Sequence, residues 1–256
     1  MKAVVYDRYG GPDRLRIEET ATPSPGPGEV LIEVKSAGLN SYDWRNLNAK
    51  PWPVRAMGQG LFRPKNRILG SDVAGVVKAV GDGVDSFRPG NAVLACLEGN
   101  GAGGLAAGGL AQFVVAKPGG LAMIPAGLSF DQAAAIPMAG GTALTAVDLV
   151  ANRPMGKLRG ITKPGGVIAV VGFWSLRRLA GVGLAGLRKK APKRVVMVIT
   201  DNKNAAYLRT LGQMVAAGQI TPVLDQSYPF SQVKEAFTHL GSYHAGGKIT
   251  VQVGTA

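Results

Sequence analysis

Two short segments carry glycines at the spacing of a loop that holds a phosphate group. The spacing G-x-G-x-x-G occurs at residues 99–104 and again at residues 181–186. It binds a dinucleotide only where a strand comes before it and a helix begins at the third glycine, because free N–H groups at the helix N-terminus hold the pyrophosphate. Another strand-like run, 110–115, follows the first segment, and no strand immediately precedes the second. We therefore predict a loop between two strands at 99–104 and a chance match at 181–186.

Few residues are suited to metal binding or nucleophilic catalysis. The single cysteine, Cys96, lies in an apolar strand-like run, and the two histidines, His239 and His244, are five residues apart. A catalytic zinc needs three protein ligands and a structural zinc needs four. Two histidines at this spacing do not share a helical face. We expect no zinc, no internal disulfide and a packing role for Cys96.

The chain is strongly basic, with a formal net charge of +13 and a sequence pI near 10.1. Its basic residues are mostly scattered, and aromatic residues that could stack on bases make up only 6%. We expect no nucleic-acid partner. Residues 174–194 are an exception to this scatter, because their leucines recur at helical spacing opposite a basic face. This pattern favours a helix that covers a core, with a membrane-surface helix as the less favoured alternative.

No segment has the pattern of a targeting signal or a membrane span. The N-terminal residues lack the apolar core of a signal peptide, and the longest apolar stretch, 165–174, is too short to cross a bilayer. We therefore expect a soluble, cytoplasmic protein.

The first half of the sequence is rich in strand patterns. Val30, Ile32 and Val34 alternate with Glu33 and Lys35, which is the period of a half-buried strand. Similar runs are separated by turns rich in proline and glycine; they lie at 2–7, 72–80, 91–97 and 110–116. Several short strands of this kind predict a closed or partly closed antiparallel barrel up to about residue 127.

The second half alternates helices with strands. Ser129 and Gln132 have the spacing of a capping box, so a helix should begin there and end or bend at Pro137. A second helix is expected to begin near Thr142, capped by its hydroxyl. Further patterns predict buried strands at 167–171 and 193–200, a helix at 204–218 stopped by Gly218, a helix at 229–240 and a strand at 246–253.

Phrases along nearly the whole chain resemble the medium-chain dehydrogenase/reductase family, in particular its zinc-independent branch of quinone oxidoreductases. The most specific are LGSDVAGVV at 69–77 and AAAIPMAGGTAL at 133–144; others lie at 1–19, 25–45, 162–172 and 244–253. The resemblance implies a mixed α/β fold, with a GroES-like antiparallel β-barrel domain and a truncated doubly wound, Rossmann-like domain. It assigns residues 1–127 with 221–256 to the GroES-like domain and 128–220 to the remnant of the nucleotide domain.

The resemblance also implies hydride transfer from NADPH, without zinc, to a quinone, an enone or another carbonyl compound. Asn40 stands where the family has its first zinc ligand, so a hydrogen-bond donor must polarise the carbonyl instead. Asn40 is our candidate donor, with Tyr42 and Asp43 as members of a small polar network. The alternative is an Asn-Ser turn capped by its own side chains. The implied cofactor-binding residues are Thr142, Gly172, Phe173 and Lys248; without the resemblance they would be a helix cap, a loop with a core aromatic residue, and an exposed strand lysine.

One expected part of the nucleotide domain is missing. The helix pattern that ends near Val150 runs directly into residues 152–166, which resemble the sequence that the family has near the end of its nucleotide domain. The junction omits at least two βαβ units, each on the order of 30 residues, including the glycine-rich turn. We expect impaired activity and a compacted remnant sheet, a partner chain on its edge, as in a homodimer, or marginal stability. The alternative function is a non-catalytic binding or scaffold protein, or an inactive truncated homologue.

Overall fold

We analysed a computed structural model of the chain, which describes residues 1–49, 55, 60–97, 108–143, 167–170, 194–197 and 204–254. By its contacts the chain divides into two units: residues 1–139 with 202–256, and residues 140–201. The first unit therefore also holds residues 128–139 and 202–220, which the resemblance assigns to the nucleotide domain. That family-domain boundary stays a prediction. Both glycine triplets lie outside the described residues, as does nearly all of the basic segment 174–194.

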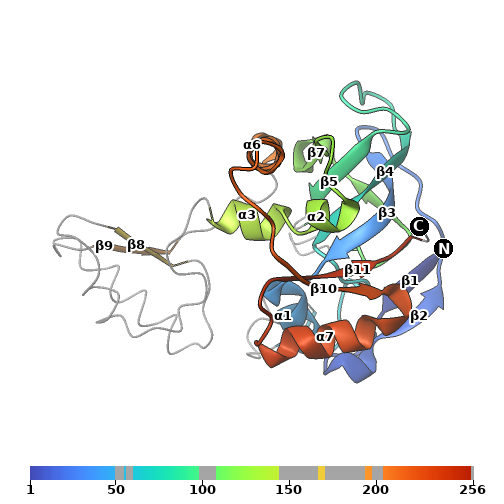
Figure 1. Cartoon of the computed structure of the whole chain (residues 1–256). Helices are drawn as coiled ribbons and strands as arrows, with labels where there is room; N and C mark the ends of the chain where they lie inside the picture. Colours follow the sequence, from blue (N-terminus) through green and yellow to red (C-terminus); the bar gives the residue numbers. More distant parts are fainter. Residues whose placement is uncertain are drawn as a thin grey trace. The chain divides into compact units, whose positions relative to one another are not determined.

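The first unit is built on a seven-stranded sheet (Figure 1). Its strand order is β10-β11-β3-β4-β5-β7, and β6 pairs with β3 beside this path. All pairs are antiparallel except β10 with β11. The strands are β3 (Val30–Gly38), β4 (Asp72–Val80), β5 (Ala92–Cys96), β6 (Phe113–Ala116), β7 (Leu121–Met123), β10 (Leu224–Pro229) and β11 (Lys248–Gln252). The strand-rich, antiparallel first half is confirmed.

Strand β3 joins the two ends of the chain. One of its edges pairs with β4 over its whole length, and its other edge is shared between β6 near Val30 and β11 near Gly38. The predicted alternation holds, because Val30, Ile32 and Val34 are buried whereas Glu33 and Lys35 are partly exposed. The C-terminal strand thus enters the sheet beside an N-terminal one.

The C-terminal segment forms a strand–helix–strand unit. Strand β10 leads through the short 3₁₀ helix η4 (Phe230–Gln232) into α7 (Val233–Ser242), and β11 then returns parallel to β10. Helix α7 buries Val233, Ala236 and Phe237, which lie at helical spacing on one face. The sequence predicted α7 and β11 correctly but missed β10, whose side chains are mostly exposed and give no alternation.

Two short helices precede the junction. Helix α2 (Phe130–Ala134) begins with the predicted capping box: Ser129 Oγ accepts from the Gln132 N–H at 3.2 Å and Gln132 Oε1 accepts from the Ser129 N–H at 3.0 Å. Helix α3 (Pro137–Ala143) begins at the proline, which suits the first turn because it has no N–H to leave unpaired. The expectation that a helix starts near Thr142 and is capped by its hydroxyl is therefore wrong, since Thr142 lies inside α3, which has already begun at Pro137.

The remaining elements of the first unit were predicted in part: the sequence patterns indicated the strand that begins at Lys2 and the helix that follows Asn204, but not the strand at 16–19 or the helix at 41–48. Helix α6 (Ala205–Ala216) fills the predicted 204–218 range, and Gly218 adopts a left-handed φ of 68° just after it. The other elements are β1 (Lys2–Val5), the 3₁₀ helix η1 (Pro12–Arg14), β2 (Arg16–Glu19), α1 (Ser41–Asn48) and the 3₁₀ helix η3 (Pro118–Gly120).

Apart from residues 140–143 of α3, the described part of the second unit is a pair of parallel strands. Strand β8 (Val167–Val170) pairs with β9 (Arg194–Met197) in register from end to end. Both lie within the predicted strands. The two strands pair with each other, and the expectation of a compacted remnant sheet stays a prediction.

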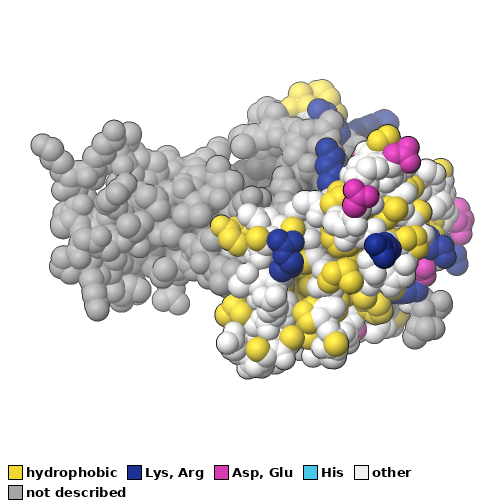
Figure 2. Space-filling model, turned by 90° about the horizontal axis from the view of Figure 1, so that it is seen from above, with side chains coloured by type: hydrophobic (Ala, Val, Ile, Leu, Met, Phe, Trp, Pro, Cys, Tyr) yellow, Lys and Arg dark blue, Asp and Glu magenta, His cyan; other side chains and the backbone are white. Residues whose placement is uncertain are grey.

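Figure 2 shows lysine and arginine side chains spread singly over one face of the described chain, among acidic and hydrophobic ones. This agrees with the scattered basic residues of the sequence. In the part of the chain that the structure describes, no helix combines the length and the hydropathy needed to cross a membrane.

Helix α2 packs so closely on the sheet that one position has no room for a side chain. A Cβ atom on Gly38 would lie 2.2 Å from the Ala134 carbonyl oxygen, whereas a Cβ on Gly119 would meet nothing within 4 Å. We predict that Gly38→Ala lowers the free energy of unfolding by about 2 kcal/mol and that Gly119→Ala changes it by less than about 0.5 kcal/mol. Urea unfolding of the two variants measures both; equal effects would contradict the packing described here.

Candidate functional site

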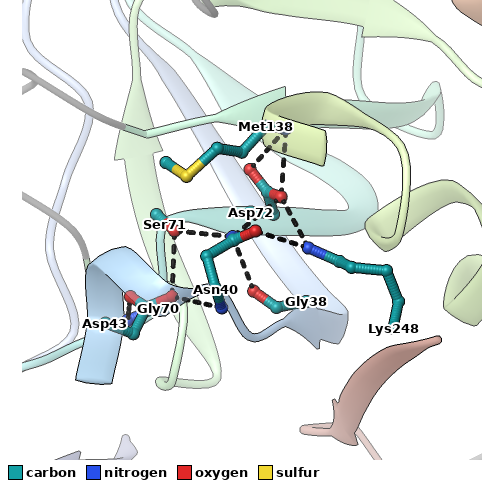
Figure 3. A network of polar contacts seen from close by, with 8 residues as sticks. All are labelled: Gly38, Asn40, Asp43, Gly70, Ser71, Asp72, Met138 and Lys248. Carbon is teal, nitrogen blue, oxygen red and sulfur yellow. Dashed lines mark hydrogen bonds and ion pairs between the residues drawn. The ribbon is translucent and has the colours of Figure 1, made fainter. Parts of the chain in front are cut away.

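A buried polar cluster lies where the ends of several elements meet (Figure 3). We call it the Asp72 cluster; its members are Asn40, Asp43, Gly70, Ser71, Asp72, Met138 and Lys248. Asn40 caps the N-terminus of α1, Asp72 is the first residue of β4, Met138 is the second of α3 and Lys248 is the first of β11. Every member belongs to the first unit.

Sheet register brings these residues together. Thr250 pairs with Gly38 across β11 and β3, and Asp72 pairs with Gly38 across β3 and β4. Extending the first register by two residues places Lys248 opposite Asn40 just beyond the end of β3. The polar side chains therefore converge because β3 is paired on both edges.

The carboxylate of Asp72 is fully buried and surrounded by donors. It accepts from Asn40 Nδ2 at 2.9 Å, from Lys248 Nζ at 3.3 Å and from the Met138 N–H at 3.1 and 3.2 Å. Burial raises the pKa of Asp72, while the Lys248 ammonium and the other donors oppose that shift. Because every described partner donates, this arrangement is built for the ionised carboxylate.

The Asn40 side chain is held at both ends. Its amide nitrogen donates to Ser71 Oγ and to Asp72 Oδ2, both at 2.9 Å, with the Gly38 carbonyl farther away at 3.4 Å, and its oxygen accepts from Lys248 Nζ at 2.6 Å. A carboxamide has two N–H groups, so these two acceptors use both of them. Asn40 could therefore polarise a substrate carbonyl only by giving up a bond to Ser71 or Asp72. The alternative of an Asn-Ser turn is replaced by a helix start, in which Asn40 is the N-cap of α1 and Asp43 accepts from the Asn40 N–H at 2.9 Å.

Lys248 is the member of the cluster with donor capacity to spare. An ammonium group has three N–H bonds, and within the described residues Lys248 Nζ donates to Asn40 and Asp72. Its side chain is 15% exposed. Lys248 does start a strand, as the residue pattern alone suggested, but it is not an exposed strand lysine.

Asp43 lies behind this arrangement and is also fully buried. It accepts from the Gly70 N–H at 3.1 Å and from Ser71 Oγ at 3.0 Å, in addition to the Asn40 N–H. Burial raises the pKa of Asp43 to about 6, with a smaller contribution in the same direction from the Asp72 charge. Because Ser71 links Asp43 to the Asn40 amide, Asp43 fixes the orientation of Asn40.

The structure thus brings together three of the predicted site residues, Asn40, Asp43 and Lys248. The Thr142 side chain, Gly172 and Phe173 lie outside the described residues, so their roles stay predictions. Sequence reasoning missed Ser71 and Asp72. A signal was available, because a carboxylate at the start of an otherwise apolar strand needs a buried partner.

The side chains of the cluster do not form a typical zinc site. Zinc prefers cysteine, histidine and carboxylate ligands, whereas Asn40 and Ser71 offer an amide and a hydroxyl that are already hydrogen-bonded. Across the described ranges, which include Cys96 and both histidines, no three His, Cys, Asp or Glu residues lie close enough to hold a metal ion. Zinc-independence itself remains a prediction.

Two family models match separate parts of the chain. The alcohol dehydrogenase GroES-like domain matches residues 26–126, and the zinc-binding dehydrogenase model matches residues 138–251. The computed structure also resembles solved structures of this fold: a quinone oxidoreductase from Coxiella burnetii has a TM-score of 0.79 at 20% identity, with 99% of each chain covered. The CurK enoyl reductase has a TM-score of 0.75 at 16% identity, with 98% of each chain covered.

Two of the curated relatives that match this chain are named as oxidoreductases. The chloroplastic quinone-oxidoreductase QR1 of Triphysaria versicolor is 38% identical over 144 residues, which are 56% of this chain and 40% of QR1. The chloroplastic NADPH-dependent alkenal/one oxidoreductase of Arabidopsis thaliana is 28% identical over 316 aligned positions, covering 98% of this chain and 79% of the relative. The aligned length exceeds the 256 residues of the chain, so this relative has internal residues with no counterpart here.

These matches and the fold define a medium-chain dehydrogenase/reductase with a GroES-like domain and a shortened Rossmann-like domain. The predicted mixed α/β fold class is confirmed. Within that superfamily the chain belongs with the quinone-oxidoreductase-like proteins.

The pKa of Asp43 predicts a specific pH dependence of stability. Because the folded pKa of about 6 lies above the ordinary value of 3.8, the stabilisation from protonated Asp43 is complete below about pH 4 and is lost as the pH rises through 6. Between those limits, Asp43 should lower the free energy of unfolding of the unmodified chain by about 3 kcal/mol as the pH rises, and Asp43→Asn should abolish that decrease. The measurement is urea unfolding from pH 4 to 7.

Asp85→Asn, at an exposed position, is the matched control and should leave the profile unchanged. An Asp43→Asn profile parallel to that of the unmodified chain would show that Asp43 does not titrate in this range.

Proposed function

We propose that this chain is an NADP(H)-dependent, zinc-independent oxidoreductase that reduces a quinone, an enone or another small carbonyl compound. The observation that carries the proposal is the Lys248 ammonium, which Asp72 and Asn40 hold in place while one of its N–H bonds has no acceptor among the described residues. The printed names of relatives, quinone oxidoreductase and NADPH-dependent alkenal/one oxidoreductase, support the substrate class.

In this proposal Lys248 donates a hydrogen bond to the substrate oxygen. Hydride addition to a conjugated carbonyl places negative charge on that oxygen, and a fixed donor stabilises the charge. Asn40 and Asp72 then act as positioning residues. This assignment replaces Asn40 as the donor, because both of its N–H groups already have acceptors.

The balance of charge favours a carbonyl oxygen over a phosphate as the partner of Lys248. The Asp72 carboxylate, 3.3 Å from Lys248 Nζ, neutralises most of the ammonium charge. A neutral ion pair still donates a strong hydrogen bond, but it attracts a pyrophosphate less than a free ammonium would. The predicted cofactor contact through Lys248 is therefore the weaker of its two assignments.

NADPH, when bound, would supply the hydride. Of the residues that the family resemblance assigns to the cofactor, only the Lys248 side chain lies within the described chain. The sequence has no strand followed by G-x-G-x-x-G and a helix, and the Arabidopsis relative has internal residues that are missing here. We therefore propose that the affinity for NADPH is lower than in relatives with a full-length nucleotide domain. We also propose that the enzyme is cytoplasmic and that a second copy of the chain completes its shortened domain.

The test is a titration of the whole chain with NADPH and NADH, followed by nicotinamide fluorescence and by turnover of quinones and enones. We expect saturable NADPH binding in the micromolar range. Lys248→Met should then lower kcat/KM by about 100-fold. The control Lys234→Met, at an exposed position of α7, should not change it. Lys248→Arg keeps the buried charge paired and should retain part of the activity, which separates loss of the donor from loss of the fold.

Absence of binding up to millimolar NADPH would contradict the proposal. It would favour the alternative of a non-catalytic protein that keeps the GroES-like domain. Binding with unchanged turnover in Lys248→Met would instead remove Lys248 from the reaction.

A further inference from the structure

One loop of the first unit presents large apolar side chains to solvent. Phe62 is 83% exposed and its neighbour Leu61 is 42% exposed. Among the described residues, no other large apolar side chain is as exposed as Phe62. Single exposed leucines are common in soluble proteins, but a nearly bare phenylalanine next to one is a feature that needs an explanation.

The loop is attached to the body of the unit on both sides of this tip. Tyr9 Oη donates to the Gly60 carbonyl at 2.7 Å, the Tyr6 N–H donates to the Arg67 carbonyl at 3.0 Å, and Pro64 is buried. The exposed pair therefore projects from an anchored turn.

Several cations lie close to the apolar tip in the sequence and line a neighbouring hollow. Arg63, Lys65 and Arg67 follow Phe62 in the sequence, and Arg8 lies on the adjacent segment. Arg8, Arg63 and Arg67 line one hollow of about 380 Å³ together with Asp7 and Pro64. The Asp7 carboxylate is shared with Arg16 and Arg67, whose side chains also contact Glu18, and no described salt bridge involves Arg8 or Arg63.

We propose that this surface, Leu61 and Phe62 with Arg8, Arg63 and Lys65, attaches the protein to the surface of an anionic lipid bilayer. Aromatic and aliphatic side chains insert at the boundary between headgroups and acyl chains, and neighbouring cations are attracted to anionic headgroups. The hollow between Arg8 and Arg63 is then the place for a headgroup phosphate. The proposal does not depend on the oxidoreductase activity.

The charge pattern favours a bilayer over a second copy of this chain. In a symmetric dimer built on this surface, Arg8, Arg63 and Lys65 would face the same cations of the other copy, whereas an anionic surface attracts them. The surface also differs from the basic segment 174–194, which sequence analysis considered for membrane binding.

The test is co-sedimentation of the whole chain with vesicles of phosphatidylcholine alone and of phosphatidylcholine mixed with phosphatidylglycerol. We expect binding to the mixed vesicles only, weakened by salt. Phe62→Ser should weaken it about tenfold, and Arg63→Gln about fivefold, which corresponds to about 1 kcal/mol per cation. Phe62→Trp should bind at least as well as the unmodified chain.

The matched controls are Val223→Ser, another exposed apolar position, and Arg88→Gln, another exposed cation; both should bind normally. Equal binding by Phe62→Ser would show that general charge is responsible, and absence of binding to mixed vesicles would reject the proposal. Two further results would also reject the proposal. One is binding of pyrophosphate without any binding to vesicles, which would identify a site for free anions. The other is a dimer that the Phe62→Ser substitution dissociates.

Discussion

The pairing of a fully buried carboxylate, Asp72, with the Lys248 ammonium is the interaction on which the site depends. A buried charge is costly unless it is paired and hydrogen-bonded, and breaking such a pair is worse than lacking it. Here the two partners come from opposite ends of the chain, the first residue of β4 and the first residue of β11. The ion pair therefore requires the C-terminal strand to be seated against β3.

The surrounding structure holds both charges in register. Strand β3 pairs with β4 on one edge and with β11 on the other, so the residue after its end, Asn40, lies between Asp72 and Lys248. Helix α2 is tied to β3 and β10, because Asp131 accepts from Ser36 at 2.6 Å and from Ser227 at 3.0 Å. Asp43, through Ser71, then fixes the Asn40 amide. One consequence is chemical: the group left able to donate is an ammonium rather than the amide.

Local signals in the sequence predicted most of the fold, whereas the site was only partly predictable. Ser129 with Gln132, Pro137 and Gly218 each act through neighbouring backbone, so their effects can be read from the sequence. Asn40, Asp43 and Lys248 were identified by family resemblance. Their mutual contacts, and the part played by Asp72, depend on the pairing of residues up to 208 positions apart, which no local pattern encodes. Strand β10 was missed because its exposed side chains show no alternation.

A double-mutant cycle on Asp72 and Lys248 tests the central claim most directly. Asp72→Asn, Lys248→Met and the double variant are compared by urea unfolding. If the pair is formed as described, Lys248→Met alone costs about 3 kcal/mol because it leaves a buried charge unpaired, and the double variant recovers much of that loss. Additive effects of the two substitutions would mean that the charges do not interact, and would contradict the arrangement on which the proposed role of Lys248 rests.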